Sequence, residues 1–292
     1  MVVPRDIPTT LKYHGPVQQA GKTPAPVDSA LARPLPTEKK DTRLRYQKRM
    51  TLVETLSNPQ TPDKASGSLY IVATPIGNLE DVSERSQRIL ASCDLIACED
   101  TRITKRLLTH LGIRRPTLSY HEHNEAARAP QIAERIAAGA SIALVSDAGT
   151  PGLSDPGFRV VRECRRQGLT VIPIPGPCAA TAALCASGLP TNGFLFAGFL
   201  PPKATARQRF FKLYRDCAYS LILYESRHRL LRLLEDSIAT LGPDRVICVA
   251  RELTKRYETF HIGAATKIKA DIEATNCRGE YVVIIANKDF HL

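Results

Sequence analysis

From residue 67 onward, short apolar runs alternate with segments in which apolar residues recur every three or four positions. Runs of this length predict buried strands, and the three-to-four-residue period predicts amphipathic helices. The predicted strands cover residues 69–73, 95–97, 117–120, 142–145 and 170–174. The predicted helices between them cover residues 82–92, 103–111, 125–138 and 158–167. This alternation is typical of an α/β domain with a mostly parallel sheet.

A second α/β pattern follows a helix predicted over residues 178–187. Gly188 and Pro190 are expected to end that helix and to begin a linker. Further strands are predicted near 194–197, 221–224, 246–250, 258–262 and 281–286, with helices near 204–214 and 229–241. The sequence therefore predicts two α/β domains, over residues 67–190 and 191–292.

The first 66 residues differ in composition from the rest. They hold nine of the 21 prolines, and their 11 Lys and Arg outnumber six Asp and Glu. Prolines, small polar residues and a net positive charge are typical of a segment that buries no core. We expect residues 1–66 to form a disordered basic arm.

Overall composition narrows the class of protein. Of the 292 residues, 43% are hydrophobic and 24% are charged, as in soluble globular chains. No apolar run approaches the roughly 20 residues that span a bilayer, and the N-terminus does not resemble a secretory signal. We therefore expect a cytoplasmic protein with no membrane contact. The net charge of +11 favours a polyanionic partner.

The chain has eight cysteines, none of them in a C-x-x-C pair. Several lie in apolar stretches, such as Cys98 and Cys248. This distribution favours reduced thiols in the core over a disulfide framework or a zinc site, and we expect no metal centre.

Glycine, proline and charged residues follow the predicted strands of the first domain, where open α/β sheets bind ligands. The chain contains no G-x-G sequence, which disfavours a dinucleotide site. Gly149 and Gly176 permit close backbone approach, and Asp147 adds a carboxylate. This combination suits a nucleoside or amino-acid moiety, unless both glycines serve only tight turns.

Eight segments, in order along the chain, resemble one known family. They are Thr74-Pro75-Ile76-Gly77-Asn78-Leu79, Glu99-Asp100-Thr101-Arg102, His121-Glu122-His123-Asn124-Glu125, Ser146-Asp147-Ala148-Gly149-Thr150-Pro151, Pro175-Gly176-Pro177-Cys178-Ala179-Ala180, Tyr224-Glu225-Ser226-Arg227-His228-Arg229, Ala250-Arg251-Glu252-Leu253-Thr254-Lys255 and Arg278-Gly279-Glu280. Together they resemble the ribosomal RNA small subunit methyltransferase I family of the tetrapyrrole methylase superfamily, over about residues 67–286.

The resemblance implies two α/β domains of tetrapyrrole-methylase type with a cofactor cleft between them. It further implies a homodimer that uses S-adenosylmethionine to methylate a cytidine 2′-hydroxyl in the decoding region of 16S rRNA. Together with the close-approach position Gly149, the cofactor-binding residues it implies are Pro75, Ile76, Ser146, Asp147, Thr150, Cys178, Ala179, Tyr224, Ala250, Arg251, Glu252, Leu253 and Gly279.

Transfer of a methyl group to a ribose hydroxyl benefits from a base that takes up the hydroxyl proton. The candidates for this base are Glu99, Asp100, His121, His123 and Glu225. Alternatively, the acidic pair caps the following helix, and the histidines form a solvated loop or part of a metal pair. Arg102, Arg251 and Lys255 are candidates for contact with a substrate phosphate or carboxylate, unless they form plain surface ion pairs.

Three basic clusters are candidates for contact with RNA phosphates. They are Arg102, Lys105 and Arg106 with Arg114 and Arg115; Arg159, Arg162, Arg165 and Arg166; and Lys203, Arg207, Arg209, Lys212 and Arg215. In the third cluster, Phe210, Phe211 and Tyr214 are expected to form the buried face of the same helix rather than to stack on bases.

The sequence departs from the family pattern in several places. Cys178 replaces the usual serine and Arg227 the usual proline, and the family's C-terminal helical segment does not follow residue 286. Two alternatives stay open. One is a tetrapyrrole methyltransferase of the same fold, although 74–79 lacks the glycine-rich first loop of that branch. The other is an RNA-binding assembly factor without catalytic turnover.

Overall fold

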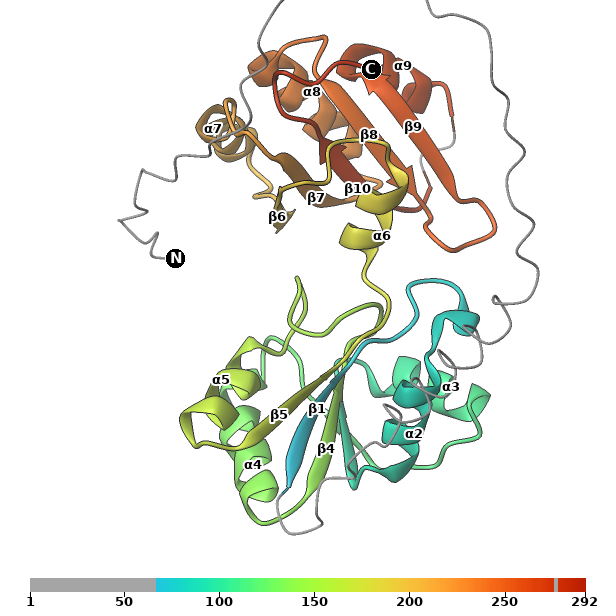
Figure 1. The fold of residues 1–292 in the computed structure, drawn as a ribbon, viewed down its shortest axis with the longest axis vertical. Helices are drawn as coiled ribbons and strands as arrows, with labels where there is room; N and C mark the ends of the chain where they lie inside the picture. Colours follow the sequence, from blue (N-terminus) through green and yellow to red (C-terminus); the bar gives the residue numbers. More distant parts are fainter. Residues whose placement is uncertain (1–66, 276–277) are drawn as a thin grey trace, which may run out of the picture. The chain divides into compact units, whose positions relative to one another are not determined.

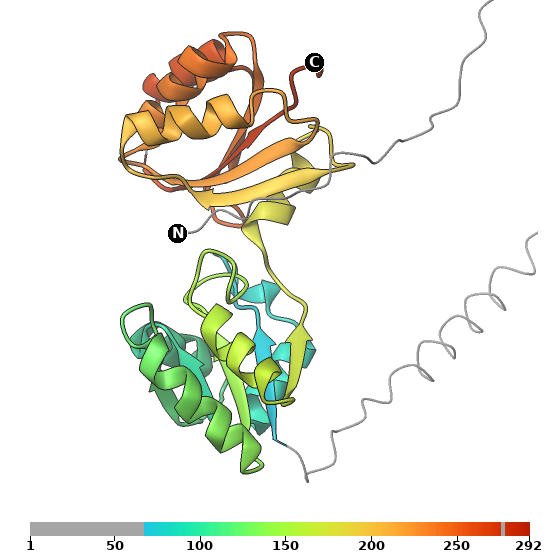
Figure 2. The same cartoon turned by 90° about the vertical axis from the view of Figure 1, so that its left-hand side faces the viewer.

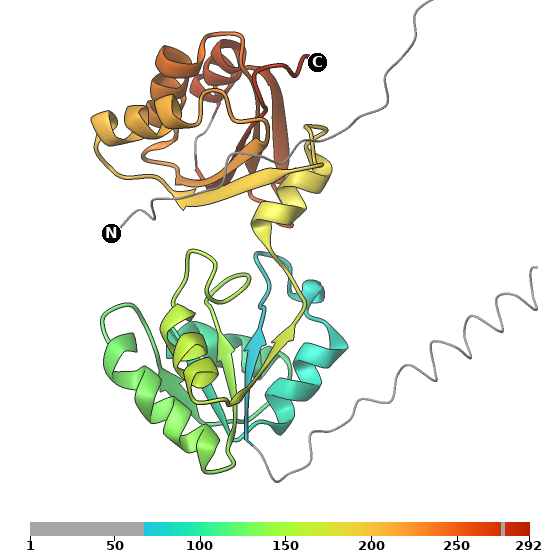
Figure 3. The same ribbon diagram turned by 60° about the vertical axis from the view of Figure 1, so that its left-hand side comes forward.

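The computed structural model describes residues 67–275 and 278–292, so the predicted arm lies outside the described residues. Two sheets organise this part of the chain (Figure 1). In the views of Figures 2 and 3, each sheet can be followed with the helices that cover it.

The first sheet has the strand order β3-β2-β4-β1-β5, and every neighbouring pair is parallel. Its strands are β1 (Ser68–Val72), β2 (Leu95–Cys98), β3 (Thr117–Ser119), β4 (Ser141–Val145) and β5 (Thr170–Ile174). The central strands are apolar on both faces, as expected when helices cover both sides of a parallel sheet. All five carboxyl ends consequently lie at one edge of this sheet.

Four helices cover the two faces of the first sheet. They are α2 (Glu84–Ser92), α3 (Thr101–His110), α4 (Glu125–Ala137) and α5 (Phe158–Arg166). The core on one face joins the sheet to α4 and α5, and the core on the other joins it to α2 and α3. Ser83 begins α2 by accepting a hydrogen bond from the Ser86 amide, and Asp100 begins α3 in the same way.

The second sheet has the order β6-β7-β10-β8-β9 and is mixed, since β6 and β7 are parallel and the other pairs are antiparallel. Its strands are β6 (Phe194–Phe199), β7 (Ser220–Ser226), β8 (Val246–Arg251), β9 (Thr259–Ala264) and β10 (Glu280–Ile285). The late strand β10 thus occupies the centre of the sheet.

Helices cover both faces of this sheet as well. One face packs against α7 (Ala204–Leu213), α8 (Leu230–Leu241) and α9 (Ala265–Glu273). The other packs against the short helix α6 (Ala179–Ala186), through Ala180, Ala183 and Leu184. Within the polypeptide, α6 precedes the Gly188–Pro190 linker, yet its buried side chains belong to the core of the second sheet.

The sequence predicted the two α/β halves and their alternating elements correctly. It missed α9 (Ala265–Glu273) and a 3-10 turn at Leu79–Asp81. Among the described residues, no helix is long and apolar enough to cross a bilayer.

Candidate active site

Two strand-end loops of the first sheet are tied together at its centre. Thr74 and Gly149 exchange backbone hydrogen bonds of 2.9 and 3.0 Å between amide nitrogen and carbonyl oxygen. The hydroxyl of Thr74 donates to the Ser146 carbonyl, and that of Ser146 donates to the Gly149 carbonyl. Gly149 has φ of +87°, a conformation that glycine adopts at no steric cost. These contacts preorganise the loop after β4.

A cleft of about 330 Å³ opens beside this loop. Predicted cofactor residues from both halves of the chain line it: Ile76, Gly149, Thr150, Cys178, Ala179, Tyr224 and Leu253. The Tyr224 hydroxyl accepts a hydrogen bond of 3.2 Å from the Ala180 amide, which fixes the ring in the cleft wall. Burial raises the pKa of Tyr224 to about 12, so this hydroxyl stays protonated. The volume lies in the range of small-molecule sites.

Backbone strain is concentrated around this cleft. Within the described ranges, the non-glycine residues with positive φ are Ser154, Glu252 and Thr254. Ser154 lines the cleft, and Glu252 and Thr254 flank the lining residue Leu253. Such conformations cost on the order of 1–3 kcal/mol each and cluster at functional sites.

A second hollow, of about 420 Å³, brings together five of the six predicted catalytic residues. They are Glu99, Asp100, Arg102, His121 and His123, and Asp147 lines the same hollow. The two histidine rings lie edge to face, with their centroids 5.9 Å apart. His121 Nε2 lies 3.0 Å from the Asn124 side-chain nitrogen, while its buried Nδ1 has no hydrogen-bond partner in the described part of the chain.

Asp100 is committed to local contacts. Its carboxylate accepts hydrogen bonds from the backbone and guanidinium of Arg102, and these hold its pKa at about 2. The Asp100 amide in turn donates to Asp147 Oδ1 over 3.0 Å. A carboxylate of such low pKa is a weak proton acceptor at neutral pH. The expected capping role of Asp100 is confirmed.

Three other carboxyl groups have raised pKa values. Burial, followed by the charge of Asp147, raises the pKa of Glu99, and burial likewise raises that of Asp147. Burial, then the charges of Glu99 and Asp147, raise the pKa of Asp155 to about 7. Asp155 lines the cleft, and within residues 67–275 and 278–292 its carboxyl has no ion-pair partner.

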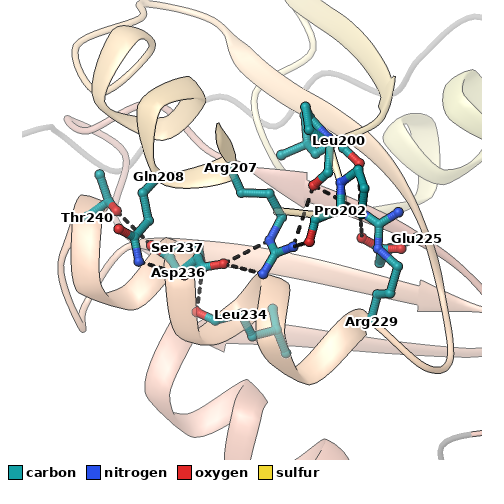
Figure 4. Close-up of polar contacts among 11 residues, drawn as sticks. Leu200, Pro202, Arg207, Gln208, Glu225, Arg229, Leu234, Asp236, Ser237 and Thr240 are labelled. Atoms are coloured by element: carbon teal, nitrogen blue, oxygen red, sulfur yellow. Dashed lines mark hydrogen bonds and ion pairs between the residues drawn. The ribbon is translucent and has the colours of Figure 1, made fainter. Parts of the chain in front are cut away.

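Glu225, the sixth predicted catalytic residue, lines the cleft and takes part in a polar network (Figure 4). Its side chain is fully buried; one carboxylate oxygen accepts from the Ser226 amide, and the other lies 3.3 Å from the Arg229 guanidinium. The Arg229 guanidinium also donates to the carbonyl of Leu200, the residue that follows β6. Glu225 is therefore engaged in holding neighbouring backbone in place.

Arg207 is not an RNA-binding candidate, contrary to the expectation from sequence. It is buried and forms a 2.6 Å ion pair with Asp236, which also accepts from Gln208 (Figure 4). Phe211 is likewise buried, which confirms the expected apolar face of this helix. The other basic residues of this cluster, such as Lys203 and Arg209, are exposed.

The remaining predicted cofactor residues lie beside the cleft rather than in its wall. Pro75, Ser146 and Asp147 line an adjacent hollow of about 200 Å³. Ala250, Arg251, Glu252 and Gly279 lie at paired ends of β8 and β10. A Cβ on Gly279 would meet the Glu252 side chain at 2.8 Å, so glycine permits that carboxylate to reach the Glu280 amide.

Sequence reasoning missed several residues of the cleft. The most informative are Leu153, Asp155, Phe199 and Glu280. Lys255, which the sequence did single out, also lines the cleft and pairs with Glu280 over 2.7 Å. The only signal for Asp155 was its position shortly after the loop that follows β4. Phe199 gave no signal, because its exposure depends on an irregularity in strand pairing.

The thiols differ in part from expectation. Cys93, Cys98, Cys164 and Cys248 are buried core residues, but Cys178 and Cys217 are half-buried and Cys185 is exposed. The expectation that all are core thiols is therefore wrong for these three. In the described residues, no group of three or more His, Cys, Asp or Glu side chains is placed to hold a metal ion.

Comparison with known proteins assigns the family. Residues 68–269 match the family model of tetrapyrrole (corrin/porphyrin) methylases. A relative from Haemophilus influenzae, "Ribosomal RNA small subunit methyltransferase I", is 47% identical over 225 residues, which cover 76% of this chain and 80% of the relative. A relative of the same name from Pseudomonas aeruginosa is 43% identical over 76% of this chain and 79% of its own length. The chain belongs to the ribosomal RNA small subunit methyltransferase I family.

The fold of this family member also matches solved structures of other methylases. Diphthine synthase superposes with a TM-score of 0.60 and 16% identity, over 77% of this chain and 92% of that one. The methyltransferase CobJ superposes with a TM-score of 0.57 and 18% identity, over 78% of this chain and 97% of that one. At such identities the likeness establishes the fold alone, and the expected tetrapyrrole-methylase architecture is confirmed.

Proposed function

We propose that this methyltransferase transfers a methyl group from S-adenosylmethionine to the 2′-hydroxyl of a cytidine in the decoding region of 16S rRNA. The observation that carries the proposal is the cleft at the strand ends, lined by seven of the 14 predicted cofactor residues, in a chain 47% identical to a named small subunit methyltransferase I. The +11 net charge supports a polyanionic substrate.

The cleft fits a methyl donor of this chemistry. Backbone at Gly149 and the loop after β5 is open to close approach, as a nucleoside requires. The aromatic face of Tyr224 suits a positively charged sulfonium. Ile76, Thr150 and Ala179 line the same cleft and would hold the donor together with Tyr224. When bound, it supplies an electrophilic methyl group.

The chain's main task is alignment, because an in-line displacement requires the hydroxyl oxygen, methyl carbon and sulfur to be collinear. Positioning of this kind supplies roughly 7–11 kcal/mol of a barrier. The Thr74–Gly149 backbone pair and the Tyr224–Ala180 hydrogen bond hold the two walls in fixed places. Because these groups are already ordered, little reorganisation accompanies the reaction.

Among the carboxyl groups, Asp155 is the one we propose as acceptor of the hydroxyl proton. It lines the cleft, and its pKa of about 7 matches what a base working near neutral pH needs. Glu99, His121 and His123 remain alternatives in the neighbouring hollow. We propose positioning roles for Asp100 and Glu225, whose carboxylates are already engaged.

We further propose that the enzyme acts as a homodimer on the small ribosomal subunit in the cytoplasm. The dimer and the subunit substrate follow from the family resemblance. The cytoplasmic location follows because ribosomal subunits are assembled there. Size-exclusion chromatography with light scattering tests the dimer: a monomer mass at working concentration contradicts it.

The deciding experiment is transfer of labelled methyl from S-adenosylmethionine to 30S subunits that lack 2′-O-methylation. Nuclease digestion and mass spectrometry then locate the label. A 2′-O-methylcytidine in the decoding region is the expected result. Donor binding without any transfer contradicts the proposed substrate, and tetrapyrroles and assembly intermediates would then be assayed. Absence of donor binding contradicts the enzymatic role itself.

A further inference from the structure

Phe199, at the last position of β6, is an exposed aromatic residue in the wall of the cleft. Its side chain is 55% exposed, although it lies in a strand and pairs in register with Tyr224. The exposed Leu153 lines the same cleft from the loop after β4. Tyr224 is half-buried, so Phe199 stands on the solvent side of the aromatic wall.

A β-bulge directs Phe199 toward the cleft. Side chains alternate between faces along a regular strand, so Phe196 and Phe199 would face opposite sides of the sheet. The register shifts between Phe196 and Gly198, which inserts one residue and brings both rings onto the face of Tyr224. Their ring centroids lie 5.0 and 5.7 Å from that of Tyr224, both edge to face.

Glycine is favoured at the bulge. Gly198 has φ of +62°, and a Cβ there would lie 2.4 Å from Ser154 Oγ. The bulge therefore also lets the loop after β4 approach the end of β6. The glycine at the strand irregularity thus lies between two residues of the cleft wall, Ser154 beside it and Phe199 next in sequence.

The backbone that follows Phe199 is firmly anchored. Arg229 donates to the carbonyls of Leu200 and Pro201, and Arg207 donates to that of Pro202 over 2.6 Å (Figure 4). Both guanidinium groups are ion-paired, to Glu225 and Asp236. An exposed ring on so rigid a segment loses little conformational entropy when a ligand stacks on it.

We propose that Phe199 is the stacking platform for the base of the nucleotide whose ribose is methylated. This inference rests on the proposed function. A ribose that enters the cleft must bring its base out of the RNA stack, and splayed bases are bound on aromatic faces. Lys203, exposed four residues later, is placed along the chain to neutralise a flanking phosphate.

The exposure of Phe199 distinguishes this role from stacking on the donor's adenine. The donor site proposed above is built from the loops after β4 and β5, with Tyr224 as its aromatic wall. Phe199 continues this wall outward, where the second substrate enters. Loss of the ring is therefore expected to affect RNA and not the donor.

A fluorescence experiment tests the contact directly, because the chain contains no tryptophan. In Phe199→Trp, the indole is the sole reporter at this position. We expect its emission to be quenched when undermethylated 30S subunits are added, and to be unchanged by S-adenosylmethionine alone. Phe194→Trp is the matched control, since Phe194 is 45% exposed on the same strand and does not line the cleft. Quenching by the donor alone, or equal quenching in both variants, overturns the proposal.

Kinetics provide the second test. Stacking on one base is worth about 1–3 kcal/mol by alanine substitution, so Phe199→Ala should raise the KM for 30S subunits about 5- to 150-fold. Donor affinity, measured by equilibrium dialysis, should stay at the wild-type value, and Phe199→Tyr should restore the KM. Phe194→Ala should match wild type.

The outcomes separate this inference from the proposed function. If wild-type enzyme methylates 30S subunits and Phe199→Ala has an unchanged KM, the stacking role is wrong and the function stands. If wild-type enzyme binds the donor but methylates no RNA, the proposed function is wrong, and the stacking role that rests on it is wrong too. A weaker donor affinity in Phe199→Ala assigns the ring to the donor and contradicts the inference.

Discussion

The backbone amide of Asp100 donates a 3.0 Å hydrogen bond to the Asp147 carboxylate, which joins the carboxyl ends of β2 and β4. These two strands are neighbours in the sheet although 47 residues separate the two aspartates. The hollow with the histidines and the loop that leads to the cleft are thereby coupled through one side chain.

Asp147→Ala should weaken binding of S-adenosylmethionine, because the loop after β4 loses its anchor to β2. A hydrogen bond to a charged group is worth roughly 1.5–3 kcal/mol, or about 10- to 150-fold in affinity. Asp147→Asn keeps an acceptor oxygen and should retain most of the affinity. Equilibrium dialysis measures both. Equal affinity in wild type and Asp147→Ala contradicts the coupling.

Asp100→Ala should mainly lower turnover and leave donor affinity close to wild type. The variant loses the helix cap and the partner of Arg102, but its amide still donates to Asp147. Loss of a cap costs about 1 kcal/mol of stability. Single-turnover methylation separates an effect on the reaction rate from an effect on donor binding. An unchanged turnover would argue against a role for Asp100 in the reaction.

The proton-acceptor role of Asp155 predicts an acid limb in the pH profile. Its pKa of about 7 means that the carboxyl of the free enzyme becomes protonated below neutrality, so kcat/KM should fall as pH drops through 7. Asp155→Asn should methylate slowly, and its activity should not fall further as pH drops through 7. If Asp155→Asn keeps the wild-type rate and pH profile, the base lies elsewhere, with Glu99 next to be replaced.

The same group also predicts a pH dependence of stability. Its pKa is raised on folding, so the folded state binds the proton more tightly than the unfolded state. The Asp155 contribution is fully present below about pH 4 and is lost as pH rises to about 7. Asp155→Asn should therefore gain thermal stability relative to wild type at pH 8 but not at pH 4. An identical difference at both values contradicts the raised pKa.

Gly198→Ala should be more damaging than alanine at another left-handed glycine. Gly112 has φ of +67° with nothing within 4 Å of an added Cβ, so Gly112→Ala incurs only the backbone cost of about 1–2 kcal/mol. Gly198 shares this conformation but would also contact Ser154. Urea denaturation should show a larger loss for Gly198→Ala, and 30S binding should weaken in that variant alone. Equal losses of stability in the two variants would mean that the loop holding Ser154 moves to accommodate the added methyl group.

The sequence predicted the elements whose periodicity is strong and the loops whose residues are chemically distinctive. The convergence of strand ends in an open α/β sheet indicated Gly149. Thr150 and Tyr224 came from the family resemblance, and all three line the cleft. The sequence did not distinguish Arg207 from its exposed basic neighbours, since burial of a charge depends on a partner 29 residues away, Asp236. Phe199 escaped notice for a similar reason, because a one-residue shift in pairing decides which face its ring occupies.

The central position of β10 bears on the order in which the protein takes shape during synthesis. Residues 68–174 contain all five strands of the first sheet, so that sheet can close while the chain is still growing. In the second half, β6 and β7 form one ribbon and β8 and β9 another, and only Glu280–Ile285 joins them. Two-stranded ribbons are marginal alone. The cleft, with Tyr281 and Val282 in its wall, is therefore completed last, and a nascent chain short of β10 lacks this part of the wall.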